Sequence, residues 1–137
     1  MSDIVYRPIG VVHSPIKDSR NAPRQPKWSN FEGEIEIFPE FVEGLNGIEK
    51  LNSIVVVFHF DRSEGYDLMV QPPHLDSMCG VFASRSPRRP NQIGISTLKL
   101  LSVAGNILRV YGIDMLDGTP VIDIKPDISG SFFEKQG

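Results

Sequence analysis

One stretch of the chain, Ile54-Val55-Val56-Val57-Phe58-His59-Phe60, decides the fold. It begins with the longest apolar run of the sequence, which contains three valines, and valine favours extended backbone. A continuous apolar run of this length is typical of a strand that is buried on both faces. We therefore predict a central β-strand over residues 54–60.

Polar and apolar residues alternate in other parts of the chain. Residues 34–37 read Glu-Ile-Glu-Ile, and residues 98–100 and 108–110 alternate in the same way. A period of two is typical of strands that have one buried and one exposed face. These segments therefore predict three further strands.

Two more strands and one short helix complete the predicted elements. Residues 80–83 read Gly-Val-Phe-Ala and favour a short strand, and residues 4–12 are rich in β-formers but contain Pro8, which favours an edge or a bend. Helical periodicity is weak everywhere. The best candidate is one or two turns over residues 40–48, where two glycines limit the helix.

Turn-forming residues separate these segments. Ala104-Gly105-Asn106 predicts a hairpin turn, and Asp117-Gly118-Thr119-Pro120 predicts a second turn. Many short strands with little helix, in a chain that must manage its sheet edges, favour closure. We predict an all-β fold: a single closed or nearly closed β-barrel with long loops, formed by residues 1–126 and followed by a C-terminal tail over residues 127–137.

Composition is that of an ordinary globular protein. The chain has 137 residues, 40% hydrophobic and 23% charged, with a net charge of -3, which excludes a basic coat over the whole surface but not a local basic patch. The single cysteine, Cys79, excludes an internal disulfide, and no His/Cys set near the aspartates suggests a transition-metal site. No secretory signal or membrane span is visible, so we expect a soluble, cytoplasmic protein.

The segment that carries most chemical information is Ser84-Arg85-Ser86-Pro87-Arg88-Arg89-Pro90-Asn91-Gln92-Ile93-Gly94. It holds three arginines within five positions, and two prolines restrict its backbone. Guanidinium groups held in this way suit bidentate contact with phosphates or carboxylates. The alternatives at this point are an anion-binding site at the mouth of the barrel and an exposed basic loop without a role.

Other polar clusters are less specific. A basic loop with Arg20, Arg24, Gln25 and Lys27 precedes Trp28 and suits either stacking of a flat ring or a plain surface loop. The acidic residues Asp114, Asp117 and Asp123 flank a turn, where capping is the commonest role of a carboxylate. His59 ends the apolar run and is either a hydrogen-bonded core residue or a pocket residue.

Several well-known sites are absent from the sequence. It contains no GxGxxG, no P-loop and no GxSxG motif. Cys79 has no basic neighbour, which favours a structural thiol over a nucleophile.

The arginine segment belongs to a longer pattern. Together, Gly80-Val81-Phe82-Ala83-Ser84-Arg85-Ser86, Arg89-Pro90-Asn91 and Ile93-Gly94 resemble the signature of the β-barrel tRNA adenine-N6 methyltransferases. Three more stretches fit the same family in order: residues 9–15, residues 23–26 and residues 116–126. The resemblance therefore extends over nearly the whole chain.

This resemblance implies a function and its partners. Members of the family use S-adenosyl-L-methionine on a small β-barrel and methylate N6 of the threonylcarbamoyl-modified adenosine (t6A) next to the tRNA anticodon. They act as homodimers with cofactor sites near the subunit interface. Carried over by motif, the cofactor contacts fall at Arg24, Gln25, Pro26, His59, Phe60, Arg85, Ile95, Asp114, Met115, Leu116 and Asp117.

Two departures from the family pattern are present. Gln92 stands where many members have proline, and Asp127 stands where an aromatic residue is common. Because the sequence stops soon after the barrel, we expect it to lack the C-terminal domain of longer members. The departures put the substrate contacts in question, and without that domain we expect less surface for tRNA.

The implied chemistry needs no nucleophilic side chain, because a sulfonium methyl donor already carries its leaving group. The weakly nucleophilic target amine needs an acceptor for its proton, and we consider Asn91, Asp114 and Asp123 as catalytic candidates. The basic side chains predicted to bind tRNA are Arg85, Arg88, Arg89, Arg20 and Lys27. A sensor or regulator that binds S-adenosylmethionine or another nucleotide, and an RNA-binding module without a cofactor, are the alternatives.

Overall fold

The computed structural model describes residues 2–18 and 29–129. Within them, six antiparallel strands close into a barrel in the order β1-β2-β7-β6-β3-β8. The strands are β1 (Gly10–His13), β2 (Glu32–Ile37), β3 (Ser53–His59), β6 (Ile93–Ala104), β7 (Ile107–Tyr111) and β8 (Pro120–Pro126). The predicted closed β-barrel is confirmed. Of the predicted tail, only residues 127–129 are described.

The side chains of each barrel strand alternate between the interior of the barrel and its outer surface. Inward residues of every barrel strand form one core, including Ile35, Ile54, Val56, Leu98 and Leu108, all at most 1% exposed. The outward residues alternate with them and are half-buried or exposed. A six-stranded cylinder therefore has a filled interior and no pore in its centre.

The central strand differs from its prediction on one point. β3 pairs with β6 on one side and with β8 on the other, as a central strand does, but only one of its faces is buried. Val55 and Val57 point outward and are half-buried. Because the barrel interior lies on only one side of the sheet, these outward valines are not enclosed by a second layer formed from residues 2–18 and 29–129.

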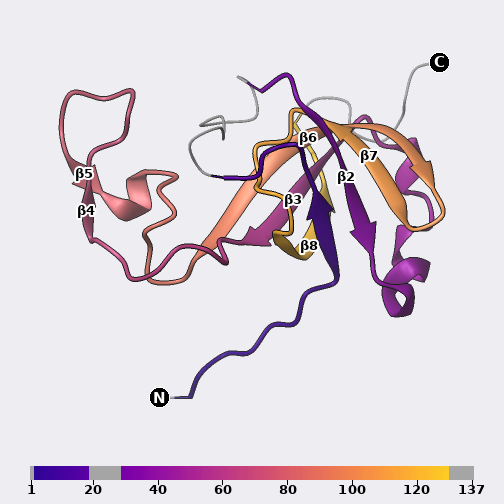
Figure 1. Ribbon diagram of the computed structural model, residues 1–137, viewed down its shortest axis with the longest axis horizontal. Helices are drawn as coiled ribbons and strands as arrows, with labels where there is room; N and C mark the ends of the chain where they lie inside the picture. The colour runs from indigo at the N-terminus through magenta and orange to yellow at the C-terminus, as the bar shows by residue number, and fades with distance from the viewer. Residues whose placement is uncertain (1, 19–28, 130–137) are drawn as a thin grey trace.

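Long connections supply the remaining structure (Figure 1). Residues 60–92 form an arm that projects from the barrel and holds the small hairpin of β4 (Met69–Val70) and β5 (Cys79–Gly80). The predicted helix over residues 40–48 forms as two 3-10 helices, η3 (Pro39–Leu45) and η4 (Ile48–Lys50), separated by Gly47 at φ 90°. Gly44 and Gly47 disfavour helical backbone, which explains why residues 40–48 do not form an α-helix.

Two predicted strands are shorter than expected. Of residues 4–12, only residues 10–12 join the sheet, as part of β1 (Gly10–His13), because Pro8 lacks the N–H that a ladder needs. Residues 80–83 were predicted as a strand, but β5 ends at Gly80 and Val81–Ala83 form the 3-10 helix η5. Val81 is 1% exposed and anchors this turn, while the backbone N–H of Ser84 donates to the Val81 carbonyl at 3.1 Å.

Both predicted turns are present. The hairpin between β6 and β7 turns at Gly105, whose φ of 61° favours glycine. The turn before β8 uses Gly118 at φ 85°, and its N–H donates to the Val12 carbonyl at 2.8 Å. This second turn brings residues 112–119 onto the rim of the barrel.

Candidate active site

One end of the barrel holds most of the residues predicted to bind the cofactor. Three segments form it: residues 59–62 at the end of β3, residues 93–96 at the start of β6, and residues 112–119 between β7 and β8. We call this end the mouth. Sheet pairing places the first two side by side, since His59 is opposite Ile93. A hydrogen bond between Ser96 and Asp114 brings in the third.

A partly buried carboxylate lies at the mouth. Asp114 Oδ1 accepts a hydrogen bond from Ser96 Oγ at 2.8 Å, and Ser96 itself is 1% exposed. Burial raises the pKa of Asp114 to about 6, while the hydrogen bond from Ser96 and the charge of Arg85 oppose the rise. A carboxyl group with this pKa exchanges its proton near neutral pH, which suits acid–base chemistry.

Arg85 is held beside that carboxylate. Its Nη1 donates to the Ile95 carbonyl on β6 at 3.1 Å, which fastens the arginine segment to the barrel. The guanidinium is near enough to lower the pKa of Asp114. The arm therefore brings a cation next to the carboxylate from a part of the chain about thirty residues away in sequence.

The other two arginines of the segment make contacts within the arm. Arg88 Nε donates to Asp67 Oδ2 at 2.7 Å and its Nη1 donates to the Glu64 carbonyl at 2.7 Å. Arg89 Nη1 donates to the carbonyls of Ser84 and Ser86 at 3.1 and 2.9 Å. These bonds shape the loop that presents Arg85.

The carboxylate of Asp117 is committed to the chain itself. Its Oδ1 accepts the backbone N–H of Ser14 at 2.9 Å, and its Oδ2 lies 3.0 Å from Lys17 Nζ. The N–H bond from Ser14, followed by the bond from Lys17, lowers the pKa of Asp117. Asp117 thus ties the exit of β1 to the mouth.

Apolar side chains also lie at this end of the barrel. The Phe60 ring meets Phe58 edge-on with centroids 5.0 Å apart, and Ile95 is 46% exposed on β6. His59 is exposed at the end of β3, so it is not a buried core histidine. Leu116 is half-buried, whereas Met115 is 2% exposed and belongs to the core.

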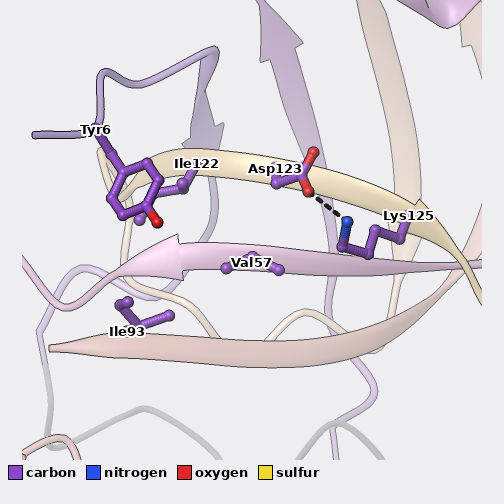
Figure 2. Close-up of a pocket in the computed structure, with 6 residues that line it drawn as sticks. All are labelled: Tyr6, Val57, Ile93, Ile122, Asp123 and Lys125. Carbon is purple, nitrogen blue, oxygen red and sulfur yellow. Dashed lines mark ion pairs between the residues drawn. The ribbon is translucent and has the colours of Figure 1, made fainter. Parts of the chain in front are cut away.

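The catalytic candidates are not all brought together. Asn91 is exposed, and its carbonyl accepts the backbone N–H of Ile93 at 2.7 Å at the start of β6. Asp123 lies on the outer wall of β8, where its Oδ2 pairs with Lys125 Nζ at 2.9 Å (Figure 2). Asp114 is therefore the candidate whose side chain bonds to the inward-facing Ser96 at the mouth.

Five predicted residues lie outside the described residues: Arg20, Arg24, Gln25, Pro26 and Lys27. The described residues on either side of residues 19–28 both bond to the mouth. Ser29 Oγ donates to the Ile113 carbonyl at 2.7 Å, and the Asp117 N–H donates to the Ile16 carbonyl at 2.7 Å.

Sequence reasoning missed Ser96, although a signal was present. In β6 the inward positions run Gly94, Ser96, Leu98 and Leu100, so a polar side chain interrupts an apolar series. Gly94 was quoted only as part of the signature. A Cβ at this position would collide with the rings of Phe58 and Phe60. Glycine therefore lets the two rings lie against β6.

Within residues 2–18 and 29–129, no group of three or more His, Cys, Asp and Glu side chains is placed to hold a metal ion. No helix of the described chain is long and apolar enough to cross a membrane.

Fold and mouth together define a small β-barrel with a carboxylate and an arginine at one rim. Residues 11–131 match the tRNA-methyltransferase O N-terminal domain, and the chain belongs to this family. The resemblance identified from the arginine segment is thereby confirmed.

Several relatives are similar in sequence over most of this chain. A probable S-adenosyl-L-methionine-binding protein of Pyrococcus abyssi is 48% identical over 90% of this chain and 67% of its own length. An S-adenosyl-L-methionine-binding protein of Archaeoglobus fulgidus is 46% identical over 89% of this chain and 88% of its own length. The tRNA (adenine(37)-N6)-methyltransferase of Escherichia coli is 38% identical over 92% of this chain, which spans 58% of that enzyme.

A solved structure agrees with the fold. The crystal structure of TrmO from Pseudomonas aeruginosa superposes with a TM-score of 0.78 at 35% identity, over 93% of this chain and 57% of that one. The chain thus spans little more than half the length of the Escherichia coli enzyme and of the Pseudomonas aeruginosa structure.

Proposed function

We propose that this chain is an S-adenosyl-L-methionine-dependent methyltransferase that acts on N6 of t6A next to the tRNA anticodon, in the cytoplasm. One observation carries the proposal: Arg85 and the partly buried Asp114 are both hydrogen-bonded to β6 at the mouth of a barrel of this family. The names of the relatives support the cofactor, and the more distant relatives support the reaction.

The residues at the mouth fit the proposed cofactor. S-adenosylmethionine combines a flat aromatic base, hydroxyl groups, a sulfonium cation and an amino-acid group. Ile95 and Phe60 offer apolar and aromatic surface to the adenine base. Arg85 offers hydrogen-bond donors to the carboxylate of the cofactor's amino-acid group, and the carboxylate of Asp114 favours positive charge near it, as on the sulfonium. We expect His59, Leu116 and the residues Arg24, Gln25 and Pro26 to complete the site.

When bound, the cofactor supplies an activated methyl group. The chain supplies position and proton transfer: Asp114 accepts a hydrogen bond from the target amine and takes its proton as the new bond forms. Ser96 orients Asp114 through the 2.8 Å bond. Burial keeps the pKa of Asp114 at about 6, so the carboxylate is largely ionised at pH 7 yet basic enough to accept a proton.

Substrate recognition depends on the basic side chains of the arm and of the loop that contains Arg20 and Lys27. We propose that Arg85 contacts a phosphate or the carboxylate of the modified base, with Arg88, Arg89, Arg20 and Lys27 extending the positive surface. The bonds of Arg88 and Arg89 within the arm give these two residues a shaping role as well. Transfer of labelled methyl groups to t6A-containing tRNA tests the function.

A second candidate is supported by the relatives themselves. Two of them, at 48% and 46% identity, are named only as binding S-adenosyl-L-methionine. A sensor or regulator would bind the cofactor without transferring the methyl group. Cofactor binding without methylation of t6A-containing tRNA would favour this role over the enzyme.

Arg85→Ala is expected to weaken S-adenosylmethionine binding about 10-fold, because a charge-assisted hydrogen bond is lost at the mouth. Isothermal titration calorimetry measures the change. Arg109→Ala is the matched control, since Arg109 pairs with Glu32 at 2.9 Å on β7, in another part of the barrel wall. Equal affinity of wild type and Arg85→Ala would remove Arg85 from the cofactor site.

The expected homodimer needs a surface that a second copy can cover. A shallow groove of about 300 Å³ lies across β8, β3 and β6 and is lined by Tyr6, Val57, Ile93, Ile122, Asp123 and Lys125 (Figure 2). The groove holds one ion pair, Asp123–Lys125, while the wall of β1, β2 and β7 carries two, His13–Glu36 and Arg109–Glu32. We propose that a second copy covers the apolar wall, because exposed apolar surface of this kind is typical of interfaces.

Ile93→Glu is expected to convert the dimer into a monomer, because it would bury two charges in the symmetric interface. Ile93 is 42% exposed, so the substitution disturbs the barrel itself little. Light scattering coupled to size-exclusion chromatography measures the mass. Tyr111→Glu, at a position 40% exposed on β7, should leave the mass unchanged. A wild-type monomer, or a dimeric Ile93→Glu variant, would contradict the interface.

A further inference from the structure

A single side chain links two segments of the mouth that are far apart in sequence. Arg62 follows β3 at the base of the arm, two residues after Phe60. Its Nη2 donates to the Asp117 carbonyl at 2.6 Å, and the same nitrogen is 3.5 Å from Thr119 Oγ1. The link spans 55 residues of chain. Neither the family signature nor the residues carried over from it includes Arg62.

The link continues through Thr119 to the next carbonyl. Thr119 is 4% exposed, and its Oγ1 donates to the Leu116 carbonyl at 2.7 Å. The Thr119 N–H donates to the same carbonyl at 3.1 Å. Arg62 therefore holds the Asp117 carbonyl directly and the Leu116 carbonyl through Thr119. These are the last two residues of the segment 114–117, in which Asp114 lies.

The orientation of Arg62 is itself fixed. Its Nε lies 3.3 Å from Asp61 Oδ1, so the guanidinium is held between its neighbour and the turn. Gly118 lies beneath it with φ 85°, a conformation that other residues adopt only at a cost. A planar guanidinium donates in several fixed directions at once, which an ammonium group does not.

We propose that Arg62 is a positioning residue that sets residues 114–117 against the end of β3 and so preorganises the cofactor site. The proposal rests on the function proposed above. Arg62 does not touch the cofactor; it acts through the backbone of the turn. In a preorganised site, no binding free energy is lost in ordering the loops of the site. Loss of the link should therefore weaken cofactor binding.

The first test uses the ligand. Arg62→Met retains much of the side-chain length but has no donors, and we expect it to weaken S-adenosylmethionine binding about 10-fold by calorimetry. The affinity of Arg62→Lys for S-adenosylmethionine should lie between those of wild type and Arg62→Met, because an ammonium group replaces the several fixed donors of the guanidinium. In turnover, the KM for S-adenosylmethionine should rise while the KM for tRNA stays unchanged. A purely structural role would lower the melting temperature and leave both affinities alone.

A coupling experiment tests the route. Thr119→Val removes the hydroxyl that links Arg62 to the Leu116 carbonyl. The double variant Arg62→Met/Thr119→Val should lose less affinity than the product of the two single losses, because both act on one turn. Arg109→Ala is the control arginine and should show independent effects. If the affinity loss of the double variant equalled the product of the two single losses, the proposed link from Arg62 through Thr119 to the Leu116 carbonyl would be overturned.

The second readout needs no ligand. Amide hydrogen exchange in the free protein should speed up at least about 10-fold at Thr119 in Arg62→Met, because the turn opens more often. Wild-type protein that gives no heat with S-adenosylmethionine would refute the proposed function, while faster exchange would still support the positioning of the turn. Binding by wild type with unchanged affinity and exchange in Arg62→Met would overturn the positioning role and leave the proposed function standing.

Discussion

Asp114→Asn is expected to stabilise the ligand-free protein at pH 8 by about 1–3 kcal/mol and to lower methyl transfer about 100-fold or more. Asparagine has nearly the same shape, and its side-chain oxygen can still accept the Ser96 hydroxyl that bonds Asp114 at 2.8 Å. Only the charge and the basic oxygen are lost. The variant therefore separates what the carboxylate does for the reaction from what it costs the fold.

The sign of the stability change follows from the pKa. Burial raises the folded-state pKa of Asp114 to about 6 from an ordinary value of 3.8. Between those pH values the folded state holds more protons than the unfolded state, so the free energy of unfolding falls as pH rises. The destabilisation is complete above about pH 7. Asparagine does not titrate, so the variant does not lose this stability as pH rises.

Urea unfolding from pH 4 to pH 8 measures this difference. The advantage of Asp114→Asn should be near zero at the acid end, grow through pH 6 and then level off. Glu49→Gln, at an exposed site on η4, is the control and should show no such growth. A pH-independent difference would mean that Asp114 is not a strained carboxylate, and full activity in the variant would mean that another group takes the proton.

Gly94→Ala is expected to destabilise the protein by about 1–3 kcal/mol and to weaken cofactor binding at the same time. The new Cβ would collide with the ring of Phe58 and come within 2.8 Å of the Phe60 ring. Phe58 is 5% exposed in the core, so its ring has little room to move. Relief of both contacts therefore requires the two rings or the β6 backbone to shift, and the Phe60 ring forms part of the mouth.

Thermal unfolding and calorimetry with S-adenosylmethionine measure the two effects. Gly44→Ala is the matched control, because a Cβ at Gly44 on η3 meets nothing within 4 Å. That substitution should leave stability within about 0.5 kcal/mol and binding unchanged. If Gly94→Ala matched Gly44→Ala in both measurements, the close packing of the rings on β6 would not matter to the site.

Most of the barrel was predictable because its determinants are local. Alternation at residues 34–37, 98–100 and 108–110 gave correct strands, and glycine at positions 105 and 118 marked real turns. Errors arose where tertiary context decides. The run at residues 54–58 suggested burial on both faces, but a closed barrel buries only its interior. An apolar outer wall and a buried second face look alike in sequence.

The site was less predictable, because its geometry depends on long-range contacts. Motif resemblance led to Arg85 and Asp114, but Asn91, Asp114 and Asp123 were indistinguishable as bases until strand direction placed Asp123 on the outer wall. The bonds from Arg88 and Arg89 to backbone carbonyls leave no trace in residue type. Only the inward position of Ser96 in β6 was readable from periodicity.

The most direct test of the account is a crystal structure of the protein with S-adenosylhomocysteine, the demethylated cofactor. We predict density for the adenosyl group at the mouth, against Ile95 and Phe60, with the side chains of Arg85 and Asp114 directed at the ligand. Ligand density in the outer groove beside Tyr6, or a mouth that excludes the ligand while it binds elsewhere, would contradict the central claim.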